Sequence, residues 1–193
     1  MEILGKILGN PARVKIMRLF LLSNGEAFEN KEIVKRSRVN SAVVRRELSL
    51  LSNVGFIKKG KQGWSFNPYF SYASQFERLL VGADQLDTNG LTEIFKKTGK
   101  VKVLIVAGKF LKNNENRVDI LIIGDKINRK KVEDSIAKLE AEIGSELTYA
   151  MFETAEFIYR INMNDKLVRD IIDFPHEIII ENKELSTYLL KKA

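Results

Sequence analysis

The residues best suited to chemistry are cations on two neighbouring segments near the N-terminus. In the segment 41–53, Val44, Leu48 and Leu51 recur at helical spacing and must be buried. We expect the outward face of that helix and the segment after it to contact DNA, because cationic and small polar side chains suit phosphates and base edges. The candidate contacts are Ser41, Ala42, Arg45, Arg46 and Ser49 on the helix, and Lys58, Lys59 and Lys61 after it. The alternative is that Arg45 and Arg46 are merely a solvated helix face.

The composition disfavours most other chemistries. The absence of cysteine excludes disulfides, thiolate nucleophiles and cysteine–zinc sites, and the single histidine, His176, excludes a multi-histidine metal centre. No apolar run reaches the length of a membrane span. The N-terminus carries Glu2 and has no small-residue cleavage site, so it does not read as a secretory signal. We therefore expect a cytoplasmic protein without a membrane partner, and most enzyme classes are disfavoured.

The net charge of +7 is unevenly distributed along the 193 residues. Residues 1–73 hold 13 Lys and Arg against 5 Glu, a balance of +8. Residues 74–193 hold 19 basic against 20 acidic residues, a balance of −1. A basic module beside a nearly neutral one indicates that the first module binds a polyanion. A merely solubilising surface would not explain the asymmetry.

Three helices are predicted in the basic part of the chain. The first begins at Asn10-Pro11, because Asn caps a helix and Pro is tolerated at its first position. The second covers 30–37 with Asn30 as its cap, and the third covers 41–53. The spacing of the apolar residues buries one face of each helix.

A basic hairpin follows the third helix. Two short strand-like runs, 56–59 and 64–67, surround GKQG, and two glycines in a short connection are typical of a hairpin loop. Trp64 is expected to pack at the base of this hairpin. Three helices and a hairpin in this order predict a winged helix-turn-helix, with the third helix in the major groove and the hairpin along phosphates or the minor groove.

The order NPARVKIMRLFLL, then SAVVRRELSLLSNVGFIKKG, resembles the winged-helix domain of arsenical-resistance-repressor-like transcriptional regulators. The resemblance is sharpest at RREL-x-x-L-x-x-x-G-Phe-Ile and covers about the first 70 residues. Metal-sensing members of that family use Cys and His ligands, which this chain lacks at those places. The resemblance therefore implies DNA binding without metal sensing. A protein-interaction winged helix is the alternative, although such modules normally lack so one-sided a basic balance.

Residues 70–90 are predicted to form a linker helix. Ala73, Phe76, Leu80 and Ala83 make an apolar stripe typical of domain packing or of a dimer seam. We expect a homodimer with Phe76 and Leu80 as anchors, because two half-sites compensate for the few base contacts of one winged helix. The competing expectation is that the stripe packs against the chain's own second domain.

The remainder of the chain predicts a small α/β domain. Its strand-like runs are separated by amphipathic helices, and two of the runs are continuous enough to be buried on both faces. The expected fold class is therefore α+β with two domains: a winged helix-turn-helix at 1–69, the linker helix at 70–90, and an α/β domain with a mixed sheet at 91–193. The expected strands are 101–108, 118–125, 146–152 and 177–182.

The pairing VLIVAGKF…RVDILIIGD resembles the minimal nucleotidyltransferase domain of the DNA polymerase β superfamily, over roughly residues 91–185. In that family a strand ends in Gly-Ser, an Asp-x-Asp opens the next strand, and a later strand supplies a third carboxylate. The resemblance places Gly108 at the Gly, Lys109 at the Ser, Arg117 at the first Asp and Asp119 at the second. Glu146 reaches the third carboxylate position only in a shifted register, and otherwise Thr148 lies there.

These departures predict a catalytically degenerate domain. An Arg in place of a metal-ligating carboxylate repels the magnesium ions that such a site must hold. Asp119 is expected to pair with a cation or cap a turn. Gly108, Lys109, Arg117 and Asp119 are a possible anion or nucleotide site, the alternative being a solvated loop with two ordinary basic residues.

The sequence as a whole predicts a DNA-binding transcriptional regulator. Its second domain would serve packing, dimerisation or the sensing of a small anionic or nucleotide ligand, without catalysis and without a cofactor. The first alternative is an active minimal nucleotidyltransferase, which would need magnesium. The second is an antitoxin-type partner of a separate toxin.

Overall fold

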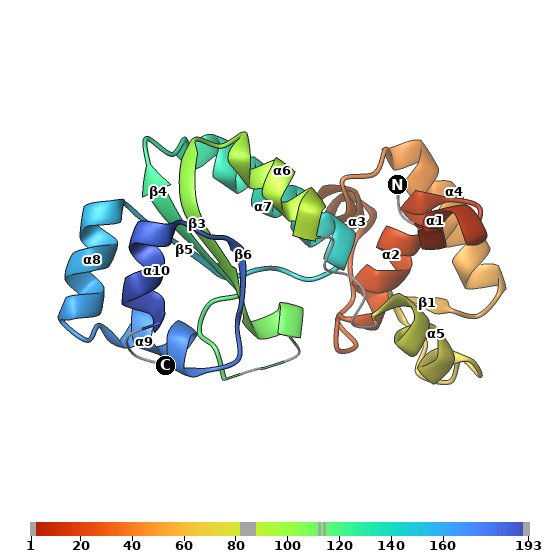
Figure 1. Cartoon of the computed structure of the whole chain (residues 1–193). Coiled ribbons are helices and arrows are strands. Elements are labelled where there is room, and N and C mark those ends of the chain that lie inside the picture. Colours follow the sequence, from red (N-terminus) through yellow and green to blue (C-terminus); the bar gives the residue numbers. More distant parts are fainter. Residues whose placement is uncertain (1–2, 82–87, 112, 114, 191–193) are drawn as a thin grey trace. The chain divides into compact units, whose positions relative to one another are not determined.

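The computed structural model describes residues 3–81, 88–111, 113 and 115–190 (Figure 1). Within these residues the chain is α+β, with ten α-helices, a two-stranded hairpin and a four-stranded mixed sheet. The α+β class and the mixed sheet are thus confirmed. The chain forms two compact units: unit 1 comprises Met1–Gly82 and Ala137–Glu146, and unit 2 comprises Ala83–Ile136 and Leu147–Ala193. The predicted division into two domains at 70–90 stays a prediction.

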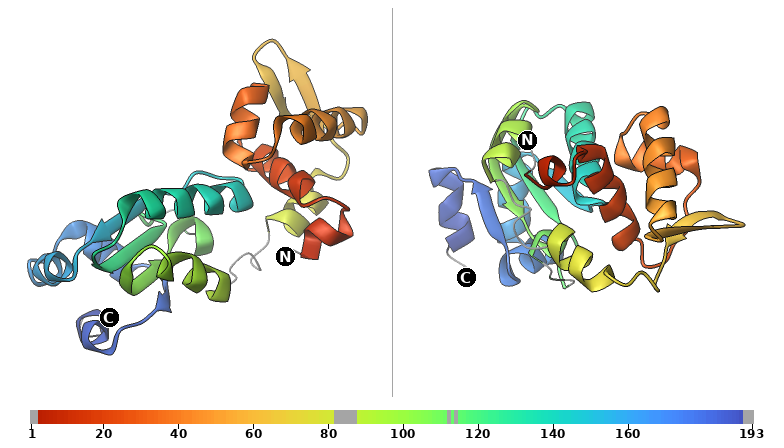
Figure 2. Two further views of the ribbon diagram at one scale, coloured as in Figure 1. Left: turned by 90° about the horizontal axis from the view of Figure 1, so that it is seen from above. Right: turned by 90° about the vertical axis from the view of Figure 1, so that its right-hand side faces the viewer.

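Unit 1 contains the helices and the hairpin expected near the N-terminus. The hairpin projects from the helices (Figure 2). Asn10 caps the second helix, accepting a hydrogen bond from Ala12 N–H, and Asn40 caps the fourth in the same way through Ala42 N–H. The elements are α1 (Ile3–Ile7), α2 (Pro11–Leu21), α3 (Asn30–Ser37), α4 (Ser41–Asn53), β1 (Ile57–Gly60), β2 (Gly63–Phe66) and α5 (Ala73–Leu80).

The predicted cap of α3 is wrong. Glu29, not Asn30, is the N-cap residue, and its side chain makes no capping hydrogen bond. Asn30 Oδ1 instead accepts a hydrogen bond from Trp64 Nε1 at 2.9 Å. The indole N–H needs an acceptor, and backbone pairing of Phe28 with Trp64 brings the start of α3 within its reach. Trp64 also packs against the core, which confirms its expected packing role. Its expected place at the base of the hairpin is wrong, because Trp64 pairs with Lys59, next to the pair Gly60–Gly63 that closes the turn.

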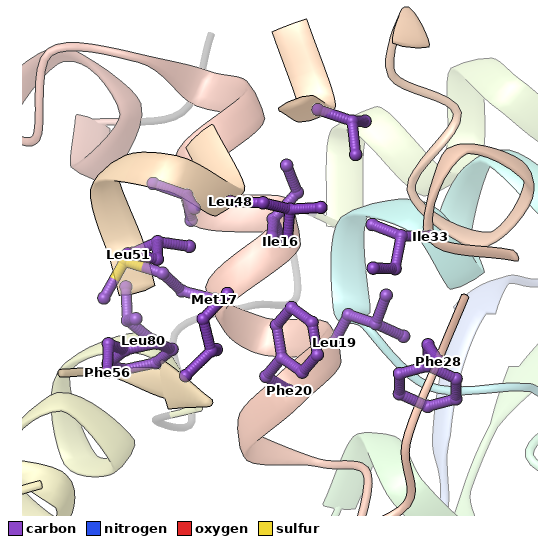
Figure 3. Packing of buried hydrophobic residues seen from close by; sticks show 13 residues of the cluster. Ile16, Met17, Leu19, Phe20, Phe28, Ile33, Leu48, Leu51, Phe56 and Leu80 are labelled. Atoms are coloured by element: carbon purple, nitrogen blue, oxygen red, sulfur yellow. The ribbon is translucent and has the colours of Figure 1, made fainter. Parts of the chain in front are cut away.

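The core of unit 1 is built around α2 (Figure 3). Ile16, Met17 and Phe20 of α2 lie in the middle of this core. Leu51, Phe56 and Leu80 pack at one end, and Phe28 and Ile33 at the other. The predicted stripe of α4 is confirmed, because Val44, Leu48 and Leu51 are all buried.

The apolar stripe of α5 faces this same core. Leu80 is 0% exposed, and Phe76 is half-buried with its ring 6.2 Å from that of Phe56 and 5.8 Å from that of Phe70. A dimer seam anchored at Leu80 is therefore wrong, because the side chain is already covered by its own unit. The competing expectation, that Phe76 and Leu80 pack against the second domain, is also wrong. Both residues pack in the core of unit 1. Ala83 lies outside the described residues.

Unit 2 is a mixed sheet with helices on both faces (Figure 1). The strand order is β5-β4-β3-β6, with β3 antiparallel to β4 and β6, and β4 parallel to β5. Helix α6 and the first half of α7 cover one face, and α8, α9 and α10 cover the other. The elements are α6 (Thr88–Lys96), β3 (Lys100–Val106), β4 (Ile120–Asp125), α7 (Arg129–Ile143), β5 (Tyr149–Phe152), α8 (Thr154–Asn162), α9 (Lys166–Asp173), β6 (Glu177–Ile180) and α10 (Lys183–Leu190).

The two central strands are buried on both faces, as their continuous apolar sequence predicted. Residues 103–106 and 120–123 are all buried. Residues 137–143, the second half of α7, are counted with unit 1. Among the described helices, none combines the length and the apolar character needed to cross a membrane.

Candidate nucleic-acid interface

The outward face of α4 carries the first group of candidate residues. Ser41, Ala42, Arg45, Arg46 and Ser49 are all exposed, while Val44 and Leu48 are buried on the opposite face. The helix is held by this apolar face and by its Asn40 cap, so the polar face stays outside the core. Arg45 forms no ion pair with any described residue.

A hollow lies between α4 and Trp64 of the hairpin. Arg45 and Ser49 line it from α4, and Trp64 and Asn30 line it from the hairpin and the start of α3. The sequence reasoning missed Asn30, Ser52 and Asn53, which also line this hollow. Extending the outward face by two further turns from Arg45 would have found Ser52 and Asn53, because they follow at i+7 and i+8.

The hairpin presents the second group of candidate residues. Lys58, Lys59 and Lys61 are exposed. Successive strand residues point to opposite faces, so Lys58 and Lys59 of β1 do not present one common surface. Lys59 Nζ lies 5.6 Å from the centre of the Trp64 ring, and Lys61 lies in the two-residue turn between the strands. Of the three lysines, only Lys59 therefore lies over the Trp64 ring, and Lys58 and Lys61 do not.

Glu47 is a buried polar residue of α4 that sequence reasoning missed. Its side chain is 1% exposed, and it accepts hydrogen bonds from Asn10 Nδ2 at 2.7 Å and Arg13 Nε at 2.8 Å. Arg46 lies 3.6 Å away. Its burial could have been predicted from its spacing. Glu47 follows Val44 by three residues and precedes Leu51 by four, which places it on the apolar stripe.

The pKa of Glu47 is set by two opposing effects. Burial raises the pKa of the carboxyl group, but hydrogen bonds from Arg13 and Asn10 and the charges of Arg13 and Arg46 outweigh it. The pKa is therefore lowered below its ordinary value, and the group is ionised at neutral pH. Glu47 thus neutralises part of the charge of Arg46, whereas Arg45 keeps its full charge beside the hollow.

The second candidate site of the sequence lies in unit 2, and Asp119 is its centre. This residue is buried, and its two carboxylate oxygens accept hydrogen bonds from Lys109 N–H and Thr148 N–H, each at 2.8 Å. Lys109 Nζ lies 4.0 Å from Oδ2. Gly108 has φ +53°, and a Cβ there would collide with Asp119 Oδ1. The carboxylate therefore braces the turn after β3 against the start of β5, in agreement with its expected role at a turn or beside a cation.

The other residues of that site have separate partners. Arg117 Nε lies 2.9 Å from Asp170 Oδ2 of α9. Thr148 N–H donates to Asp119, while Glu146 belongs to unit 1 and pairs with Arg36 at 3.2 Å. Unit 2 thus brings Gly108, Lys109 and Asp119 together, with Arg117 engaged by α9. In the part of the chain that the structure covers, no group of three or more His, Cys, Asp or Glu side chains could hold a metal ion.

Comparisons with known proteins give no match to this chain, whether against family models, curated proteins or solved structures.

Proposed function

We propose that this protein is a DNA-binding transcriptional regulator, and that residues 1–69 act as a winged helix-turn-helix. Helix α4 would enter the major groove of duplex DNA, with the hairpin along phosphates or the minor groove. One observation carries the proposal: the face of α4 opposite the core is exposed, and it carries Arg45 beside the hollow that Trp64 lines from the hairpin. The hairpin adds the exposed cations Lys58 and Lys61, whose charge suits phosphate contact.

We further propose that the nucleotidyltransferase-like module has lost catalysis. The bonding of Asp119 supports this, because both of its oxygens already accept backbone N–H groups. Arg117 adds a positive charge where such a site would need a negative one. The module would then serve packing, homodimerisation or the sensing of a small anionic or nucleotide ligand. Magnesium would be needed only if the module were an active transferase.

Changing Arg45 and Arg46 to Ala tests the recognition helix. Each lost base contact should cost about 1–3 kcal/mol of binding free energy. A genome-wide DNA pull-down with the purified protein supplies the target duplexes, and fluorescence anisotropy then measures the dissociation constants. The matched control is Lys166→Ala/Arg169→Ala, which removes two exposed cations from α9 of unit 2. A double Arg variant that binds as the parent does would show that the recognition-helix assignment is wrong.

A further inference from the structure

Unit 2 contains a strongly basic segment that the near-neutral average of residues 74–193 conceals. Residues 96–131 hold 11 Lys and Arg against 3 Asp and Glu, a balance of +8. Residues 132–193 hold 7 basic against 13 acidic residues, a balance of −6. The positive charge of unit 2 is therefore concentrated in less than a third of the sequence that follows residue 73.

The fold brings most of these cations to one end of the sheet. Asn128 N–H donates to Thr98 C=O at 2.8 Å, and Lys100 of β3 is the register partner of Asp125 of β4. The α6–β3 and β4–α7 turns therefore lie side by side (Figure 1). We call the exposed cations in and beside these turns the basic corner: Lys96, Lys97, Lys100, Lys126, Arg129, Lys130 and Lys131.

Little negative charge is available to neutralise the basic corner. Arg129 pairs with Glu133 at 3.2 Å, and the other six cations form no ion pair with any residue that the structure describes. Asp125 is already engaged by Lys102, which lies outside the basic corner, at 2.7 Å. The hydrogen bond from Lys102, together with Thr154, lowers the pKa of Asp125 to about 2, so its charge is matched by Lys102.

Two features of the basic corner oppose local stability. Arg129, Lys130 and Lys131 lie in the first turn of α7, which has no acidic residue, although cations are disfavoured at a helix N-terminus. Lys126 has φ +52°, a left-handed conformation that Gly or Asn adopts at lower cost. The cations of the first turn therefore do not stabilise α7, and the backbone conformation of Lys126 does not require a lysine.

We propose that the basic corner is a second DNA-binding surface, which contacts the phosphate backbone of duplex DNA without reading its sequence. This inference rests on the proposed function and deepens it, because it gives unit 2 a direct part in binding. Six of the seven cations are Lys, a point charge suited to phosphates rather than to bidentate base contacts. The corner is distinct from the possible anion site, since Gly108 and Asp119 lie at the opposite ends of β3 and β4.

Duplex DNA fits this surface better than a membrane or a single small anion. Within the described residues of 88–136, no large apolar side chain is exposed, although a membrane-surface element needs such residues for insertion. Seven cations on two turns also exceed what one phosphate group would neutralise. A backbone with repeated phosphates supplies enough negative charge to engage several of them at once.

The test compares two double variants of the full chain. Lys130→Gln/Lys131→Gln removes two cations of the basic corner from the first turn of α7. The matched control, Lys166→Gln/Lys183→Gln, removes exposed cations from the first positions of α9 and α10, outside the basic corner. Fluorescence anisotropy with a mixed-sequence 30-base-pair duplex, titrated from about 50 to 300 mM KCl, gives the slope of log Kd against log salt. The slope should fall by about 0.9 for each lost phosphate contact, and the control should keep the slope of the parent.

Repeating the change in the Arg45→Ala/Arg46→Ala background separates the two proposals. If Arg45→Ala/Arg46→Ala binds DNA as the parent does and Lys130→Gln/Lys131→Gln still flattens the slope, the basic corner is supported. The same result overturns the proposed role of α4. If the background weakens binding while the corner variant keeps the full slope, the basic corner is overturned alone. A parent that binds no duplex at 50 mM KCl overturns both. Binding of phosphatidylserine vesicles that is lost in the corner variant, with no change in the DNA slope, would overturn the proposal in favour of a membrane.

Discussion

Glu47 links the start of α2 to α4, the helix that carries Arg45 and Arg46. Asn10 both caps α2 and donates to Glu47, while Arg13 donates to Glu47 and to Leu8 C=O at 2.8 Å. Burying a lone carboxylate is costly, but paired hydrogen bonds from a cation and an amide compensate for the lost water. The orientation of α4 therefore depends on a polar contact as well as on its apolar stripe.

Glu47→Gln should lower the free energy of unfolding by about 1–3 kcal/mol at pH 7, because charged hydrogen bonds become neutral ones. A carboxyl group with a lowered folded-state pKa stabilises the protein above its unfolded pKa, about 4.3. That contribution is lost as pH falls through the folded-state pKa. Urea unfolding at pH 7 and pH 3 should therefore show that the difference between parent and variant shrinks at the lower pH.

The control for this prediction is Glu26→Gln, which changes an exposed glutamate of the same unit. Its unfolding curves should follow those of the parent at both pH values. Parallel pH profiles for the parent and Glu47→Gln would contradict the assignment of Glu47 as a stabilising carboxylate.

At the scale of single residues, the sequence predicted which side chains of α4 are exposed. It did not predict which residues form hydrogen bonds with each other. The outward positions of Arg45 and Ser49 follow from the helical period, which depends only on near neighbours. Glu47 was missed because its donors, Asn10 and Arg13, lie 37 and 34 residues away in the chain. Asn30 was assigned as a cap for the same reason, since its partner Trp64 is 34 residues distant.

At the scale of elements, the proposal gives α4 and the hairpin different roles in binding. A helix in the major groove reads base edges, whereas lysines on a hairpin contact phosphates that are the same at every sequence. Removing hairpin cations should therefore weaken binding to all duplexes equally. Removing Arg45 and Arg46 should weaken binding to the target duplex more than to others.

Lys58→Gln/Lys61→Gln tests this difference and leaves Lys59 on the Trp64 ring. The salt dependence of binding should flatten by about 0.9 for each lost phosphate contact, with the ratio of target to mixed-sequence affinity unchanged. Anisotropy titrations with both duplexes measure the two quantities, and Lys166→Gln/Lys183→Gln serves again as the control. A change in the affinity ratio would show that the hairpin takes part in reading sequence.

The helices were more predictable than the strands and the linker. Asn10-Pro11 marks the start of α2 in the sequence itself, because capping is a local interaction. Strand ends depend on hydrogen bonds to distant segments, and the run predicted at 146–152 is a strand only from Tyr149 to Phe152. The sequence showed that one face of α5 is apolar. Only the tertiary structure shows that Leu80 on this face lies in the core of unit 1.

At the scale of the whole molecule, charge averaged over long segments was a poor guide. The +8 of residues 1–73 was evident, whereas the equal balance of residues 96–131 was concealed by acidic residues on both sides. Counting charge in shorter windows would have found it. The sequence alone could not show that Lys100 and Lys126 lie at the same end of the sheet, because that depends on the antiparallel pairing of β3 with β4.

Asp119 joins two segments of unit 2 through its carboxylate. If this carboxylate braces a turn, Asp119→Ala should destabilise the protein by about 1–3 kcal/mol for each buried N–H left without an acceptor. Those groups belong to Lys109 and Thr148, and urea unfolding measures the loss. Asp119→Asn should cost less, because its amide oxygen still accepts one of the two hydrogen bonds. It therefore serves as the folded variant for the activity assay.

Neither the parent nor Asp119→Asn should transfer nucleotides. Two-metal phosphoryl chemistry needs carboxylates free to hold the ions that stabilise the attacking and leaving oxygens. Here the Asp119 oxygens accept two backbone N–H groups, and the ammonium of Lys109 lies 4.0 Å from one of them. The assay incubates the protein with labelled ATP, CTP, GTP and UTP, magnesium or manganese, and protein or RNA acceptors. Metal-dependent labelling by the parent that is lost in folded Asp119→Asn would show that this module is an active transferase, with its carboxylate released from the turn during catalysis.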